Sequence, residues 1–252
     1  MNIRYITCSD LREHIPIDEA VKLLNINPRV ELGIQAHNCA MNTGLPRHAW
    51  FDKLVKISER LAKPLNLALH VNGSWCTRFC NYDIPQDLRS WMDSKNQNTS
   101  LPTVGRWQLN IGDNTGKIDI GKLADVIKNG FDHNCELIIP YNIKTAGLID
   151  ELDKKDAAFS LLFDESYGVG KSPSEWRAPV YDNHPQGYSG GLCGDNIMDN
   201  LDKISKVVTD DRPVWIDAEG RLMQPGTRIF DIARAKNYIS NILAWLDKNN
   251  TR

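Results

Sequence analysis

Apolar residues in this chain recur in short runs of strand length, and segments with apolar residues at helical spacing follow most of these runs. The runs predict eight strands, over residues 3–8, 30–35, 65–71, 104–111, 137–139, 159–164, 187–190 and 214–217. Between the first two runs, Ile17, Ala20, Val21 and Leu24 recur on one face of a predicted helix. The pattern therefore predicts repeated strand-helix units.

Eight such units predict an α/β fold in which a parallel sheet closes into a single (β/α)8 TIM barrel over residues 1–252. Parallel strands need helical crossovers, and eight of them allow the sheet to close. About 250 residues is the usual size of one such barrel. A doubly wound open sheet is the alternative, but no Gly-x-Gly-x-x-Gly motif follows the first strand.

Composition narrows the classes of partner. The chain is 41% hydrophobic and 25% charged with a formal net charge of -2, so it offers no electrostatic basis for binding nucleic acid or an anionic membrane. The first eight residues are too short and polar for a secretion signal. The six cysteines form no dense disulfide framework. We therefore expect a cytoplasmic protein with a small-molecule metabolite as its partner.

The chemistry of such a barrel lies at the carboxyl ends of its strands. Polar, thiol or glycine residues in these places are Cys8, Gln35 to Cys39, Arg47, His70, Asn72, Gln108, Asn110, Asp164, Gly190, Gly191 and residues 217–221.

Cys8 and Asp164 stand at the ends of the first and sixth predicted strands, where a thiol and a carboxyl facing across the barrel mouth could act as base and acid. Each residue also has a structural interpretation. Cys8 could be a small buried apolar residue, and Asp164 could cap the loop or helix that follows it.

The sequence from Asp164 through Gly168-Val-Gly170-Lys171 to Trp176, followed by Gly190-Gly191-Leu192, resembles a motif of the phosphoribosylanthranilate isomerases of tryptophan biosynthesis. In that family a strand-one cysteine removes a proton from the sugar C2′ and a strand-six aspartate protonates the ring oxygen. The resemblance implies that Cys8 is the base and Asp164 the acid. It implies no organic cofactor, because the chemistry is proton transfer alone.

The resemblance also implies substrate-binding residues. Arg47 would bind a carboxylate, although it could instead be a solvated arginine at a helix start. Gln108 and Asn110 occupy the strand-four motif, and Gly190 and Gly191 would offer backbone amides to a phosphate at a helix N-terminus.

The loop after the eighth strand departs from the family, because Asp217 is followed by Ala218, Glu219, Gly220 and Arg221. Glu219 would repel a phosphate unless Arg221 or another cation neutralised it. Both residues are predicted to contact the substrate. We therefore expect a diverged isomerase-like barrel enzyme that acts on a small sugar-derived metabolite, either phosphorylated or not.

Residues 72–103 form an expanded segment after the third strand, the only long irregular part that the sequence predicts, with one short helix marked by Leu88, Trp91 and Met92. Its Trp75, Phe79, Tyr82 and Arg78 suit stacking on a planar ligand or a lid, and equally a hydrophobic plug or a subunit contact in a homodimer.

A zinc site could combine Cys76 and Cys80 with His37, Cys39 and His70. A Cys-x3-Cys spacing without a second close pair is a weak signal, so no metal is predicted.

Two other functions fit the same residues. The barrel could bind a small metabolite without turning it over. It could also be a lyase or hydrolase that uses Asp164, Glu165, Asp217 and Glu219.

Overall fold

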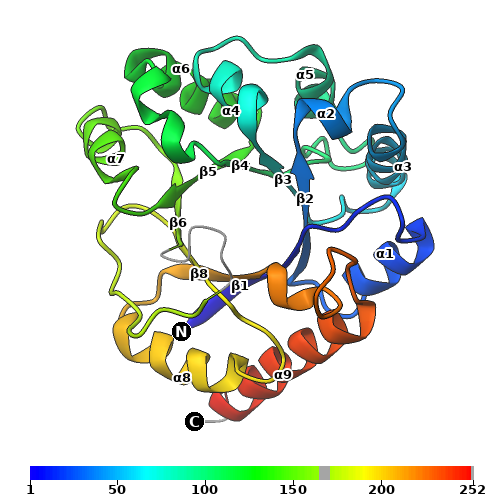
Figure 1. Cartoon of the computed structure of the whole chain (residues 1–252), viewed down its shortest axis with the longest axis vertical. Coiled ribbons are helices and arrows are strands. Elements are labelled where there is room, and N and C mark those ends of the chain that lie inside the picture. Colours follow the sequence, from blue (N-terminus) through cyan, green and yellow to red (C-terminus); the bar gives the residue numbers. More distant parts are fainter. Residues whose placement is uncertain (165–170, 251–252) are drawn as a thin grey trace.

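The computed structural model describes residues 1–164 and 171–250 of the chain. Within these ranges, eight parallel strands close into a barrel in chain order, and β1 pairs with β8 (Figure 1). The strands are β1 (Asn2–Ser9), β2 (Val30–Ala36), β3 (Leu67–Val71), β4 (Arg106–Leu109), β5 (Glu136–Tyr141), β6 (Ser160–Phe163), β7 (Gln186–Ser189) and β8 (Pro213–Ala218). The predicted (β/α)8 barrel is confirmed.

Helices surround the barrel in the outer ring of Figure 1. They are α1 (Ile17–Leu24), α2 (Asn38–Met41), α3 (Pro46–Arg60), α4 (Gly73–Cys80), α5 (Gln86–Asp93), η1 (Gly112–Lys117), α6 (Ile120–Asp132), α7 (Ala146–Asp153), α8 (Ile197–Val207), η2 (Gly220–Leu222) and α9 (Ile232–Asn250). In the described part of the chain, none of them combines the length and apolarity needed to cross a membrane.

The segment after β3 is more regular than the sequence predicts, because it contains α4 in addition to α5, the short helix expected around Leu88, Trp91 and Met92. Trp75 and Phe79 of α4 are buried in the outer hydrophobic core, and Phe79 stacks on Trp107 of β4 with ring centroids 5.8 Å apart. Tyr82 is 48% exposed. The two buried rings therefore act as a hydrophobic plug, and the predicted stacking of these rings on a ligand is wrong.

Side chains on β1 alternate between the barrel interior and the helical layer, as successive strand residues do. Tyr5 packs with the interior cluster of Ile138, Leu162 and Trp215, whereas Cys8 belongs to the core shared with the helices. A register shift in the pairing of β1 with β8 between Ile3 and Tyr5 changes which residues face inward.

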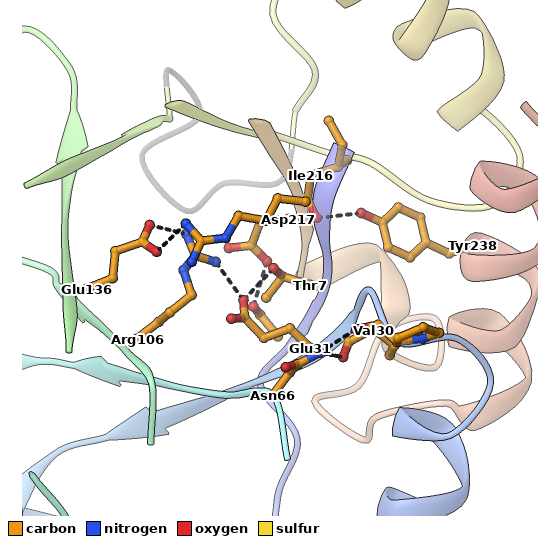
Figure 2. A network of polar contacts seen from close by, with 12 residues as sticks. Thr7, Val30, Glu31, Asn66, Arg106, Glu136, Ile216, Asp217 and Tyr238 are labelled. Atoms are coloured by element: carbon orange, nitrogen blue, oxygen red, sulfur yellow. Dashed lines mark hydrogen bonds and ion pairs between the residues drawn. The ribbon is translucent and has the colours of Figure 1, made fainter. Parts of the chain in front are cut away.

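An ion network fills the lower part of the barrel, near the first residues of β4 and β5. The Arg106 guanidinium lies 2.9 Å from a Glu31 carboxyl oxygen and 3.1 Å from one of Glu136 (Figure 2). It also lies over the rings of Tyr5 and Trp215, 4.7 and 4.2 Å from their centroids. Burial opposes the charged form, yet the two carboxylates raise the pKa of Arg106.

Candidate functional site at the barrel mouth

A cavity of about 630 Å³ opens at the carboxyl ends of the strands. This volume lies in the range of small-molecule sites, about 300–1,000 Å³. The cavity is strongly polar. Its lining residues are Asp10, Arg12, Gln35, His37, Arg47, Asn72, Gln108, Asn110, Gly112, Asp113, Pro140, Asn142, Lys144, Asp164, Glu219 and Arg228.

The structure brings five of the nine predicted site residues to this one cavity: Arg47, Gln108, Asn110, Asp164 and Glu219. They come from four separate parts of the barrel, namely α3, the end of β4, the end of β6 and the loop after β8. The other four, Cys8, Gly190, Gly191 and Arg221, are absent from its described lining.

Cys8 does not reach the cavity. Its neighbours Thr7 and Ser9 point into the barrel, where they donate hydrogen bonds to Glu31 at 2.7 Å and to Asp217 at 2.6 Å. The Cys8 side chain therefore faces the helices, and it is completely buried in the outer core. Burial, with Asp217 adding to it, raises the pKa of the Cys8 thiol far above its usual range. This placement matches the interpretation of Cys8 as a buried apolar residue and leaves it unsuited to act as a base.

Gly190 and Gly191 follow β7 with φ angles of 128° and 58°, a left-handed backbone that favours glycine. Arg221 donates a hydrogen bond of 3.4 Å to the Gly191 carbonyl oxygen. The role of this loop in binding a phosphate stays a prediction. Glu165, Gly168 and Gly170, which belong to the predicted motif or to the hydrolase interpretation, lie outside the described residues.

Arg47 lines the cavity with only 7% of its surface exposed, so it is not a solvated arginine. Its Nε donates a 2.7 Å hydrogen bond to a Glu13 carboxyl oxygen. A ligand carboxylate would have to share Arg47 with Glu13 or displace Glu13 from it.

The sequence did not single out Asp10 and Arg12, although they follow directly after β1. Asp10 has a φ of 66°, and its backbone N–H donates to the Gly33 carbonyl oxygen at 2.8 Å. Arg12 donates two hydrogen bonds to the Asp10 carboxylate, at 2.9 and 2.6 Å. Both residues could have been predicted from their positions just after the end of a strand. Arg228 gave no such signal, because it lies ten residues beyond Ala218, the end of β8.

Three carboxyl groups gather where β6 and β8 end. Asp164 and Glu219 line the cavity, and Asp217 lies inside the barrel below them, 6% exposed. Burial, aided by the negative charges of Glu219, Glu31 and Asp164, raises the pKa of Asp217 to about 8, although the Ser9 hydrogen bond opposes the shift.

Water reaches Glu219 through the cavity, and the residue is exposed. Enclosure by the surrounding protein, together with Asp10 and Asp164, still raises its pKa to about 7. Cavity water screens these charges more at Glu219 than at Asp217, so Asp217 holds its proton more firmly.

Four amide side chains continue from Glu219 around the mouth and form what we call the amide arc: Gln35, Asn72, Asn110 and Gln108. Gln108 donates to Asn110 at 2.9 Å, and Asn110 donates to Asn72 at 2.9 Å. Asn72 donates to Gln35 at 2.6 Å, and Gln35 donates to Glu219 at 3.1 Å. All four bonds run in the same direction and end on a carboxylate.

Below the arc, His70 of β3 approaches Ser9 of β1 across Gly33 of β2. A Cβ on Gly33 would lie 2.4 Å from the Ser9 Oγ and 2.9 Å from the His70 Nε2, so only glycine fits there. His70 is 2% exposed, and its Nδ1 has no hydrogen-bond partner among the described residues. Burial lowers the pKa of His70 to about 3, which keeps the ring neutral.

No group of three or more His, Cys, Asp or Glu side chains in the described ranges is arranged to hold a metal ion. Of the residues weighed for zinc, Cys76 and Cys80 lie in the outer core with their sulfurs 3.9 Å apart. The His37 Nδ1 instead lies 2.9 Å from the Cys39 Sγ at the surface.

No protein-family profile matches the sequence, and no curated protein matches it. Solved structures do match. The phosphoribosyl anthranilate isomerase from Thermotoga maritima aligns over 97% of this chain and 100% of its own, with a TM-score of 0.55 and 12% identity.

TrpF from Jonesia denitrificans aligns over 96% of this chain and 97% of its own, with a TM-score of 0.54 and 14% identity. The 3-hexulose-6-phosphate synthase from Salmonella typhimurium aligns over 95% of this chain and 99% of its own, with a TM-score of 0.51 and 9% identity. Over nearly its whole length, the chain therefore shares the barrel fold of phosphoribosylanthranilate isomerase structures.

Proposed function

We propose that the protein is an isomerase-like barrel enzyme that moves protons on a small sugar-derived metabolite at the barrel mouth. One observation carries the proposal. Asp164 from the end of β6 and Glu219 from the loop after β8 line the same cavity, and their charges influence each other. Two carboxyl groups that face one ligand can take and return a proton on its two sides.

The raised pKa of Glu219, about 7, suits this role, because a general acid or base works best when its pKa lies near the working pH. Asp164 keeps the acid role that the resemblance gives it. Glu219 replaces Cys8 as the partner group, since the thiol faces the helices. Asp217 lies below the cavity, hydrogen-bonded to Ser9, and its pKa of about 8 keeps it mainly protonated and neutral at the working pH of this pair.

The reaction would need no organic cofactor, since a proton is the only group that moves. Asn142 and Lys144 after β5 complete the wall next to Asp164. Lys144 pairs with Asp113 at 2.5 Å, so its charge is balanced by a carboxylate on this wall.

A second candidate is a barrel that binds the metabolite without turnover, favoured by the complete hydrogen-bonded amide arc and by the withdrawn thiol. The hydrolase or lyase candidate rests on the same Asp and Glu cluster, but the described residues give it no metal site. Each of these two functions would give products different from those of isomerisation.

The test is turnover of a polar metabolite extract in D2O, followed by mass spectrometry. Isomerisation converts one compound into another of equal formula and introduces deuterium where a C–H bond is broken and remade. Asp164→Asn and Glu219→Gln should each slow this conversion by about 100-fold or more, because each removes one proton-transfer group. Asp199→Asn, at an exposed site on α8, is the matched control.

Hydrolysis or elimination would change the formula and support the third candidate. A compound that is retained without any change would support the binding protein. Conversion at the wild-type rate in both Asp164→Asn and Glu219→Gln would refute the proposed roles.

A further inference from the structure

The proteins with a similar fold include one named for phosphoribosyl anthranilate and one named for 3-hexulose-6-phosphate. The mouth of the present barrel is built differently from what a phosphate ester requires. The following inference rests on the proposed function, since it concerns the ligand of the same site.

We propose that the amide arc is a hydroxyl-recognition site, and that the ligand is a non-phosphorylated, hydroxyl-rich metabolite of sugar size. The arc's internal hydrogen bonds decide which groups are left for a ligand. An amide side chain has two N–H donors and a carbonyl oxygen with two lone pairs.

Asn72 uses both donors internally, toward the Gln35 Oε1 at 2.6 Å and the His70 carbonyl oxygen at 2.7 Å. Asn72 is therefore the positioning residue of the arc. Gln35 and Asn110 each donate one internal hydrogen bond and accept one, and Gln108 donates one. Within the described part of the chain, these three amides keep both a donor and an acceptor for a ligand.

A hydroxyl group donates one hydrogen bond and accepts others, so it can satisfy an N–H and a carbonyl oxygen on adjacent amides. A row of neighbouring hydroxyls matches the repeated donors and acceptors of the arc. A phosphate oxygen only accepts, so it would leave the amide carbonyls of the arc unmatched.

The charged residues of the cavity wall also favour a ligand without a phosphate. Three lining cations already have carboxylate partners: Arg12 pairs with Asp10, Arg47 with Glu13 and Lys144 with Asp113. A phosphate would have to compete with each of these carboxylates. It would also meet Glu219 at the end of the arc.

Arg228 is the remaining arginine or lysine among the described lining residues, and it lies close enough to Glu219 to lower that group's pKa against the larger effects that raise it. It forms no ion pair with a described residue. One arginine beside a carboxylate suits a neutral ligand or a single carboxylate better than a doubly charged phosphate.

A nucleobase would also offer donors and acceptors to amides, but it needs a flat apolar surface on which to stack. Among its described lining residues, the cavity has no Phe, Tyr or Trp, and its one bulky apolar residue is Pro140. The lining therefore favours a hydrated polyol over a planar base.

The test uses saturation-transfer NMR with pairs of probes that differ only in a phosphate: D-ribose with D-ribose 5-phosphate, and D-glucose with D-glucose 6-phosphate. D-Ribonate tests a single carboxylate, and inorganic phosphate is included alone. At least one unphosphorylated probe should bind about tenfold more tightly than its phosphate ester.

Gln35→Leu should weaken that binding by about tenfold, since it removes two hydrogen bonds of the arc and its contacts to the ligand. Asn110→Leu is the second variant, in case the first does not fold. Gln97→Leu is the matched control, because Gln97 is exposed and lies outside the arc.

Tighter binding of the phosphate esters would overturn the inference. So would the absence of binding by every unphosphorylated probe, or binding that neither arc variant weakens. Because the readout is binding, the outcome is separate from turnover. Unphosphorylated sugars that bind but never isomerise would leave the ligand class standing and refute the proposed function.

Discussion

The ion network around Arg106 and the cavity at the mouth are both built from charged side chains inside one barrel, but they treat charge differently. In the lower layer, one guanidinium serves two carboxylates, Glu31 and Glu136, and two aromatic rings enclose it. At the mouth, the hydrogen bonds that reach Asp217 and Glu219 come from the neutral side chains Ser9 and Gln35.

The pKa values reflect this difference. Arg106 and Arg4 overcome the effect of burial and lower the pKa of Glu136, although at Glu31 burial outweighs Arg106 and raises the pKa. At the mouth, burial and neighbouring acids raise the pKa values of Asp217 and Glu219. The Glu136 carboxylate, paired with both Arg106 and Arg4, therefore stays ionised near neutral pH and has a structural role. Carboxyl groups that crowd together without a fixed cation can exchange protons. The mouth is therefore the layer of the barrel that is suited to chemistry.

Removing the cation of the lower layer should have the largest effect. Arg106→Met leaves Glu31 and Glu136 without their shared partner, and we expect a loss of about 3–5 kcal/mol in the free energy of unfolding. Urea unfolding measures it. Arg4→Met is the control, because the Arg4 side chain is 46% exposed and its ion pair with Glu136 should contribute less than about 1 kcal/mol. Equal losses in the two variants would show that the buried Arg106 network contributes no more to stability than the exposed Arg4 ion pair.

Gly33→Ala tests the close packing just below the mouth. The new Cβ would lie 2.4 Å from the Ser9 Oγ, so strand β2 or its neighbours must move, at a cost of about 1–3 kcal/mol. Gly105→Ala is the control, since nothing lies within 4 Å of its Cβ position. A thermal unfolding scan that places Gly33→Ala level with Gly105→Ala would show that this packing is not tight.

The pKa of Asp217 predicts how stability depends on pH. Its folded pKa of about 8 exceeds the unfolded value of about 3.9, so the native state holds more protons between these values. The stability that this group contributes is complete below about pH 4 and is lost as pH rises toward 8, by up to about 1.4 kcal/mol per pH unit.

Asp217→Asn removes this dependence, and its Oδ1 can still accept the Ser9 hydrogen bond. Urea unfolding at pH 5 and pH 8 should therefore show the variant gaining on the wild-type protein as pH rises. Asp199→Asn should show no such trend if Asp217 is the cause. A gap between Asp217→Asn and wild type that stays constant with pH would mean that Asp217 titrates normally.

The smallest effect is expected at Cys8. Cys8→Ala removes a thiol that faces the helices, so turnover of the substrate found in the extract should stay within about twofold of wild type. Ser9→Ala, one residue along, should lower turnover, because Ser9 faces the interior and bonds Asp217. A folded Cys8→Ala protein without activity would restore the thiol as the base.

Cys8 and Ser9 also show which features of the structure the sequence predicts and which it does not. Apolar runs and helical spacing predict the barrel, because the strands of a parallel sheet are buried on both faces and read as short apolar runs. Because both faces of β1 are buried, the apolar pattern does not show which of its residues face the barrel interior. The register shift between Ile3 and Tyr5 then places Ser9, not Cys8, at the interior.

Asp164, Gln108, Asn110 and Glu219 could be predicted because they stand at or just after strand ends. Arg228 could not, since a loop after β8 folds it back over the mouth. Helix α5 was predicted from Leu88, Trp91 and Met92. Helix α4 was missed because its eight residues begin with Gly73 and Ser74, which are weak helix formers.

The dependence of kcat/KM on pH, measured for wild type, Glu219→Gln and Cys8→Ala, tests most directly that the mouth carboxyls transfer the proton. We expect a transition near pH 7 in wild type and in Cys8→Ala that is absent from the residual activity of Glu219→Gln. A transition that persists in Glu219→Gln and disappears in Cys8→Ala would contradict it.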